Sequence, residues 1–111
     1  MSDVAAFSGK MGELQKLRVS IVILVSQENS KLLSRRQRVA GKEIEVMCAE
    51  RDLAEVGETG GDEVIQCKVL LALREEESSA RQALTEIEDQ IDLLQALMAR
   101  VDADIAALCQ S

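Results

Sequence analysis

The sequence predicts an all-α fold in the form of a long antiparallel helical hairpin, a two-helix coiled coil. Apolar residues recur at alternating spacings of three and four along two long runs, which is typical of helices that pack side by side. The chain has no proline, tryptophan or tyrosine and one phenylalanine, so we expect an aliphatic core. We expect a single domain with a flexible N-terminus at residues 1–9, a first helix at 10–56, a turn at 57–61 and a second helix at 62–109.

The first helix is expected to begin between Ser8 and Glu13, after small residues that little holds in place. Its first apolar stripe consists of Leu14, Leu17, Ile21 and Leu24. The following apolar residues recur every seven positions, at Val25, Leu32, Val39, Val46 and Leu53, with Ile44 and Met47 widening the stripe. This change of phase predicts a stutter in the coiled coil. Alternatively, the β-branched stretch 19–25 forms a short strand.

The turn is predicted from Gly57, Gly60 and Gly61. Gly57 can adopt a positive φ and close the first helix, because it has no Cβ. Thr59 or Asp62 can then accept hydrogen bonds from the free amides of the second helix. In the alternative interpretation, the glycines only loosen one continuous helix.

The second helix carries the most regular pattern in the chain. Its apolar residues alternate at spacings of three and four, at Leu84, Ile87, Ile91, Leu94, Met98, Val101, Ile105 and Leu108. The same phase extends backwards through Leu70, Leu73 and Ala80, and it places Glu77 at a core position. This pattern predicts helix packing rather than any particular chemistry.

A turn centred on residue 59 sets a register between the helices that the charges support. The basic residues between 31 and 42 then face acidic residues between 75 and 89. Glu77 falls opposite Gly41, where the hairpin is expected to have a weak waist. This waist is interpreted as a hinge, a place where the helices splay, an entry point for another subunit's side chain, or a solvated stretch without consequence.

The apolar surface near the open end of the hairpin exceeds what one seam can bury. The partner-binding residues predicted there are Val19, Val22, Ile23, Leu93 and Leu97. A helix that is apolar on more than one face is normally covered by further helices. We therefore expect another chain, either a second copy or a helical partner, to complete the hairpin to a bundle.

Composition argues against most other functions. The net charge of −7 and the near absence of aromatic residues disfavour nucleic-acid binding, and the acidic polar faces disfavour an anionic membrane surface. The longest apolar run, residues 21–25, is far shorter than the ~20 residues of a membrane span. No cleavable signal peptide is evident, so we expect a cytoplasmic protein.

No enzyme, cofactor, metal or small-molecule substrate is expected. The chain has no histidine, no phosphate-binding loop and no nucleophile with an evident base. The carboxylates at 75–77 are interpreted as a solvated or ion-paired helix face. The three cysteines form neither a zinc site nor a disulfide framework, although a bridge between Cys48 and Cys67 is conceivable in an oxidising compartment.

The resulting prediction is a protein-protein interaction module, a coiled-coil hairpin subunit or adaptor. In its small size, acidity and surplus apolar surface the composition is similar to that of the small chaperones of bacterial secretion systems. That resemblance implies an alternative function, in which the chain holds a helical client. A further alternative is that the two helices open out and pair with other chains.

Overall fold

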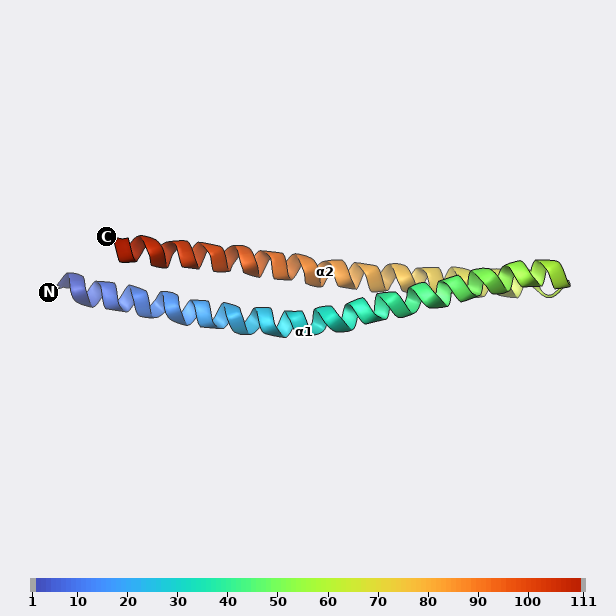
Figure 1. Ribbon diagram of the computed structural model, residues 1–111, viewed down its shortest axis with the longest axis horizontal. Coiled ribbons are helices and arrows are strands. Elements are labelled where there is room, and N and C mark those ends of the chain that lie inside the picture. Colours follow the sequence, from blue (N-terminus) through green and yellow to red (C-terminus); the bar gives the residue numbers. More distant parts are fainter. Residues whose placement is uncertain (1, 111) are drawn as a thin grey trace. The chain divides into compact units, whose positions relative to one another are not determined.

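The computed structural model describes residues 2–110 and consists of two long helices joined by a tight turn (Figure 1). Helix α1 spans Ser2–Thr59 and α2 spans Glu63–Gln110. The predicted all-α helical hairpin is therefore confirmed. Residues 19–25 are helical, so the alternative of a strand in this stretch is wrong.

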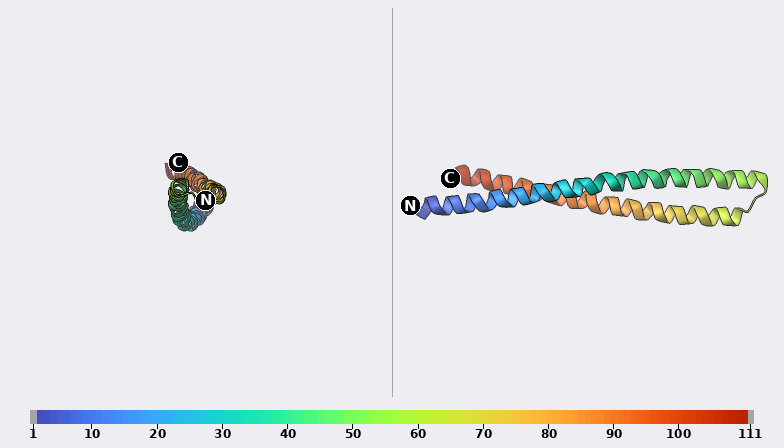
Figure 2. Two further views of the ribbon diagram at one scale, coloured as in Figure 1. Left: turned by 90° about the vertical axis from the view of Figure 1, so that its right-hand side faces the viewer. Right: turned by 90° about the horizontal axis from the view of Figure 1, so that it is seen from below.

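The chain divides into two compact units. One unit, here called the terminal unit, combines α1 up to Ser30 with α2 from Glu88 onward; the other, the turn unit, comprises Lys31–Ile87. Within the terminal unit the N-terminal part of α1 lies beside the C-terminal part of α2, drawn blue and red in Figure 2. Within the turn unit the two helices run antiparallel on either side of the turn.

Helix α1 begins earlier than expected, at Ser2 rather than between Ser8 and Glu13. No proline interrupts the first residues, and Asp3 places a carboxylate in the first turn, where the helix dipole favours negative charge. The described side chains from Asp3 to Lys10 are all exposed. The flexibility expected for this segment stays a prediction.

The turn closes α1 later than the expected position at Gly57. Gly60, with a φ of 78°, takes the left-handed conformation, and the amides of Gly60 and Gly61 both donate to the carbonyl of Val56, at 2.9 and 3.2 Å. Gly57 stays helical within the last turn of α1. Ending the helix at Thr59 keeps Val56 half-buried and satisfies its carbonyl.

Asp62 caps the start of α2, as one of the two predicted alternatives requires. Its Oδ1 accepts hydrogen bonds from the amides of Val64 and Ile65, at 3.0 and 3.2 Å. The side chain of Thr59, the other predicted cap, lies outside the described residues. The break at residues 60–62 also shows that the glycines do not merely loosen one continuous helix.

Burial along α1 follows one unbroken heptad phase, so the predicted stutter is wrong. Ile21 is 4% exposed, whereas Leu17 and Leu24 are 48% and 44% exposed and lie outside the seam. From Ile21 onward the seam residues, all buried or half-buried, are Ile21, Val25, Glu28, Leu32, Arg35, Val39, Lys42, Val46, Ala49, Leu53 and Val56. Ile44 and Met47 are exposed and do not widen this seam.

Burial along α2 confirms the predicted seam. Every apolar residue that the spacing places in it, from Leu70 to Leu108, is buried or half-buried, and Glu77 occupies the predicted core position. In the terminal unit, Ile21 packs with Leu94 and Val101. In the turn unit the packed core residues are Val46, Ala49 and Leu70, with Leu53 and Leu73 against them.

Candidate functional site

The terminal unit exposes more large apolar side chains than it buries. Its buried core residues are Ile21, Ile91, Leu94 and Val101. Its large apolar side chains that are 41% to 70% exposed are Val4, Phe7, Leu17, Val19, Val22, Ile23, Leu24, Leu93 and Leu97. All five predicted partner-binding residues belong to this exposed set.

One side of the terminal unit, which we call the leucine flank, consists of Leu17, Leu24, Leu93 and Leu97. Successive residues of a helix are turned by about 100°, so a residue directly before a seam residue lies on one flank of the seam. Leu24 precedes Val25, and Leu97 precedes Met98, both of which are half-buried. Leu93 lies one turn before Leu97 and adjoins it on the surface.

A pocket shows that the leucines of the two helices share this flank. It is lined by Leu17 with Lys10, Glu13, Leu14, Asp104 and Leu108. Asp104 follows Leu97 by one heptad and therefore lies on the same side of α2. The flank thus combines apolar side chains from both helices with a rim that carries both signs of charge.

Val22 lies on the opposite flank of the seam, because it directly follows Ile21 rather than preceding a seam residue. The polar contact between the helices nearby joins Arg18 Nε to Asp102 Oδ1 at 2.8 Å. Both side chains are about half exposed, so solvent screens this pair and it fixes orientation more than it stabilises the fold.

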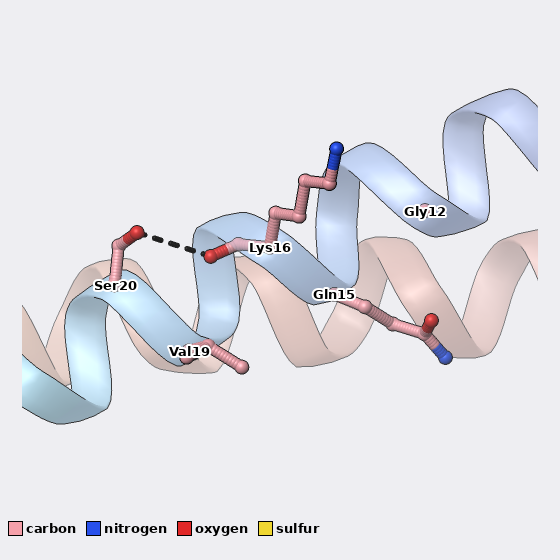
Figure 3. A pocket seen from close by; sticks show the side chains of 5 residues that line it. All are labelled: Gly12, Gln15, Lys16, Val19 and Ser20. Carbon is pink, nitrogen blue, oxygen red and sulfur yellow. Dashed lines mark hydrogen bonds between the residues drawn. The ribbon is translucent and has the colours of Figure 1, made fainter.

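Val19 and Ile23 lie on the outer face of α1, away from the seam. Figure 3 shows a pocket on this face, lined by Gly12, Gln15, Lys16, Val19 and Ser20 of α1 alone. The Ser20 hydroxyl donates to the Lys16 carbonyl at 3.1 Å and is satisfied within the helix. The polar lining of this pocket therefore offers a partner mainly Gln15 and the Lys16 ammonium.

The predicted partner-binding residues thus fall on three faces. The structure brings Leu93 and Leu97 together, and likewise Val19 and Ile23, because each pair is separated by one helical turn. Val22 lies apart from both pairs. Leu17 and Leu24 belong to the exposed surface, although their spacing predicts them in the seam. Their neighbours Arg18 and Val25 occupy the true seam positions, and the charge of Arg18 obscured that phase.

The polar residues at the waist of the turn unit are paired with one another. Lys42 Nζ, at a seam position, contacts Glu76 Oε2 at 2.9 Å and Glu45 Oε2 at 3.0 Å. The hydrogen bond that Lys42 donates to Glu76, followed by the one it donates to Glu45, raises the pKa of Lys42 above its ordinary value. The contact between Lys42 and Glu76 also falls on the predicted register.

Glu77, predicted as a misplaced core residue, is compensated by Arg81. Its Oε1 accepts hydrogen bonds from Arg81 Nε at 3.0 Å and Nη2 at 2.9 Å, and this contact raises the pKa of the guanidinium. Arg81 Nη2 also lies 2.6 Å from Oε1 of Glu43 in α1. A Cβ added at Gly41, the residue predicted opposite Glu77, would meet no atom within 4 Å. Whether the waist is a hinge stays a prediction.

The described residues contain no grouping of three or more histidine, cysteine, aspartate or glutamate side chains that could hold a metal ion. Cys48, Cys67 and Cys109 are free, so the conceivable bridge between Cys48 and Cys67 is not formed. Neither of the described helices has a stretch long and apolar enough to span a bilayer. The described surface therefore offers a partner exposed apolar side chains that lie near ion pairs.

Comparison of the chain with protein-family models, with curated proteins and with solved structures finds no match.

Proposed function

We propose that the chain is a non-enzymatic protein-binding subunit or adaptor, and that it assembles with another chain by helix packing on the terminal unit. The observation that carries this proposal is the set of nine large apolar side chains exposed there. Exposed apolar side chains that adjoin one another, as those of the leucine flank do, mark interaction sites in soluble proteins. The leucine flank packs against a helix of the other chain, and the outer face of α1 provides a second surface for such packing.

The total exposed surface supports the same conclusion. The chain exposes 7952 Å², whereas a compact monomer of 12.1 kDa exposes about 6,000 Å². The excess of about 2,000 Å² is larger than the roughly 800 Å² that each partner buries in a standard protein interface. Among the described side chains none is fully buried, so the core of the single chain is incomplete.

The alternative of a small helical chaperone has support from the same incomplete core. A chaperone of this kind releases its client and is loosely ordered alone, whereas a subunit stays in a complex of fixed stoichiometry. Either function suits the cytoplasm, where thiols remain reduced, because Cys67 and Cys109 are free and exposed.

Two substitutions test the proposed surface. Ile23→Asp and Leu97→Asp each place a charge on an exposed apolar position, so we expect them to weaken assembly or partner binding at least tenfold, at about 1.4 kcal/mol per tenfold. Helicity should stay unchanged, because neither side chain belongs to the seam. Mass by sedimentation equilibrium and helicity by circular dichroism provide the two readouts.

Asn29→Asp and Gln95→Asp are matched controls, because both residues are polar and exposed, and each directly follows a seam residue and so lies on the flank opposite the leucine flank. They introduce the same charge and should leave assembly unchanged. An unchanged mass and unchanged partner binding in both test variants would contradict the proposed surface. Equal loss in the controls would assign the effect to charge alone.

A further inference from the structure

In the turn unit, α1 carries a second apolar stripe, which we call the outer stripe. Its members are Leu33, Ala40, Ile44, Met47 and Ala54. Leu33, Ile44 and Met47 are 61%, 61% and 67% exposed. Leu33, Ala40, Met47 and Ala54 recur every seven residues, with Ile44 between the second and third. This spacing is the same heptad pattern that forms the seam with α2.

The outer stripe faces away from α2. Ile44 lies five residues after Val39 and two before Val46, both of which are buried in the seam. At about 100° per residue, Ile44 is turned by about 140° to 160° from these two seam residues. Helix α2 cannot cover both stripes, so only a further helix can bury the outer one.

The outer face of α2 differs between residues 75 and 85. The residues exposed there between 75 and 85 include Glu75, Ser78, Gln82 and Thr85. A helix that approached this face would meet polar side chains. Nearer the turn, Val64 and Leu71 of α2 are exposed and apolar, so it is beside residues 75–85 that α1 presents the more apolar outer face.

The charges of the same segment identify what fits it. Residues 31–42 carry five basic and no acidic side chains, whereas residues 43–59 carry six acidic and one basic. Antiparallel pairing of this segment with a second copy of itself sets each half against the opposite charge, and parallel pairing sets like against like. Arg36 and Arg38 make no ion pair with any residue that the structure describes, so their charge is available to a partner.

Side-chain size supports the same arrangement. If the twofold axis passes between Glu43 and Ile44, opposing residues have numbers that sum to 87, and Ile44 is offset by one residue from its own copy. Leu33 then lies opposite Ala54 of the second copy, and Met47 lies opposite Ala40. Large residues face small ones at these positions, as interdigitating helices require. A shallow pocket beside Ile44 and Met47, also lined by Cys48 and Arg51, provides space for the incoming side chains.

We propose that the outer stripe is a homodimer interface, in which α1 pairs with α1 of a second copy in antiparallel orientation around Ile44. The contact is isologous, because each copy contributes the same surface. It uses the turn unit only and does not depend on the surface proposed for the terminal unit. The chain therefore has one surface for its own copy and another for a further partner.

Thiol cross-linking of the full chain tests the interface and its register. In the background Cys48→Ser, Cys67→Ser and Cys109→Ser, the variant Ile44→Cys should form a disulfide-linked dimer under mild oxidation. Leu33→Cys and Ala54→Cys should each fail to cross-link alone and should cross-link when mixed. Gln82→Cys on the outer face of α2 is the control for random collision. Cross-linking of Ile44→Cys no stronger than this control would overturn the proposal, as would strong cross-linking of Leu33→Cys alone.

Sedimentation equilibrium of the variant Ile44→Asp provides a second measurement. We expect its dimer dissociation constant to rise at least tenfold with helicity retained, while Ser78→Asp, an exposed position on α2, leaves it unchanged. A wild-type chain that is monomeric at every concentration would overturn self-pairing and assign the stripe to a different protein. A mass that responds to Leu97→Asp but not to Ile44→Asp would overturn this interface and leave the terminal-unit surface standing.

Discussion

The chain reverses direction at residues 60–62, and Gly60 and Asp62 explain how. Gly60 takes a φ of 78°, which residues with a Cβ rarely adopt, and Asp62 satisfies two amides at the start of α2. Val56 connects the two helix ends, because its carbonyl accepts from both glycine amides, and a Cβ added at Gly61 would lie 3.3 Å from its Cγ1. The turn is thus held by backbone geometry and capping.

Two glycine substitutions with opposite expected effects test this description. Gly60→Ala should lower the free energy of unfolding by about 1–2 kcal/mol, because alanine must adopt the left-handed conformation. Gly12→Ala should raise it by about 0.5–1 kcal/mol, since Gly12 is helical and a Cβ there meets nothing within 4 Å. Chemical denaturation measures both. Equal destabilisation by the two variants would contradict the assigned roles.

The two helices differ in how far their packing can be predicted from sequence. Along α2 the seam positions are almost all apolar, so the spacing alone identifies them. Along α1 the charged residues Glu28, Arg35 and Lys42 occupy seam positions and hide the phase. Their charges are tolerated because a two-helix seam is open at its sides, where Lys42 reaches Glu76. Apolar Leu17 and Leu24 then suggested a different phase that the structure does not have.

A pair of neighbouring leucines tests the seam of α2. Leu70 is 6% exposed and packs with Val46 and Ala49, whereas Leu71 is 60% exposed. Leu70→Ala should cost about 2–3 kcal/mol of stability, at the low end of the range for buried leucines because the core is shallow. Leu71→Ala should change stability by no more than about 0.5 kcal/mol. Comparable losses in the two variants would show that the seam is assigned to the wrong residues.

Part of the candidate site could also be predicted. The five partner-binding residues predicted from the sequence are exposed, because each lies outside the heptad seam. Their division among three faces could not be predicted, since it depends on the seam phase of α1 that the charged residues conceal. The outer stripe is not predicted for a similar reason: the spacing places Ile44 and Met47 on the seam side of the helix. The seven-residue recurrence of Leu33, Ala40 and Met47 was the available signal.

At the scale of the whole molecule, charge and apolar surface are unevenly distributed. Residues 57–111 carry twelve acidic and four basic side chains, whereas residues 1–56 carry eight acidic and nine basic. Ion pairs between α1 and α2, such as Glu50 with Arg74 at 3.2 Å, set orientation within the turn unit. Such exposed ion pairs add little stability, so they do not compensate for the small amount of apolar surface that the single chain buries. Stability is therefore expected to depend on association and hence on protein concentration.

The central claim is that this chain completes its core by packing against another chain, and sedimentation equilibrium of the purified protein over a wide concentration range tests it most directly. Circular dichroism on the same samples reports the helicity. The claim predicts a helical species of discrete mass, a dimer or larger, whose melting temperature rises with concentration. A chain that is fully helical, cooperatively folded and monomeric at every concentration would contradict it, because a single copy would then need no partner to complete its core.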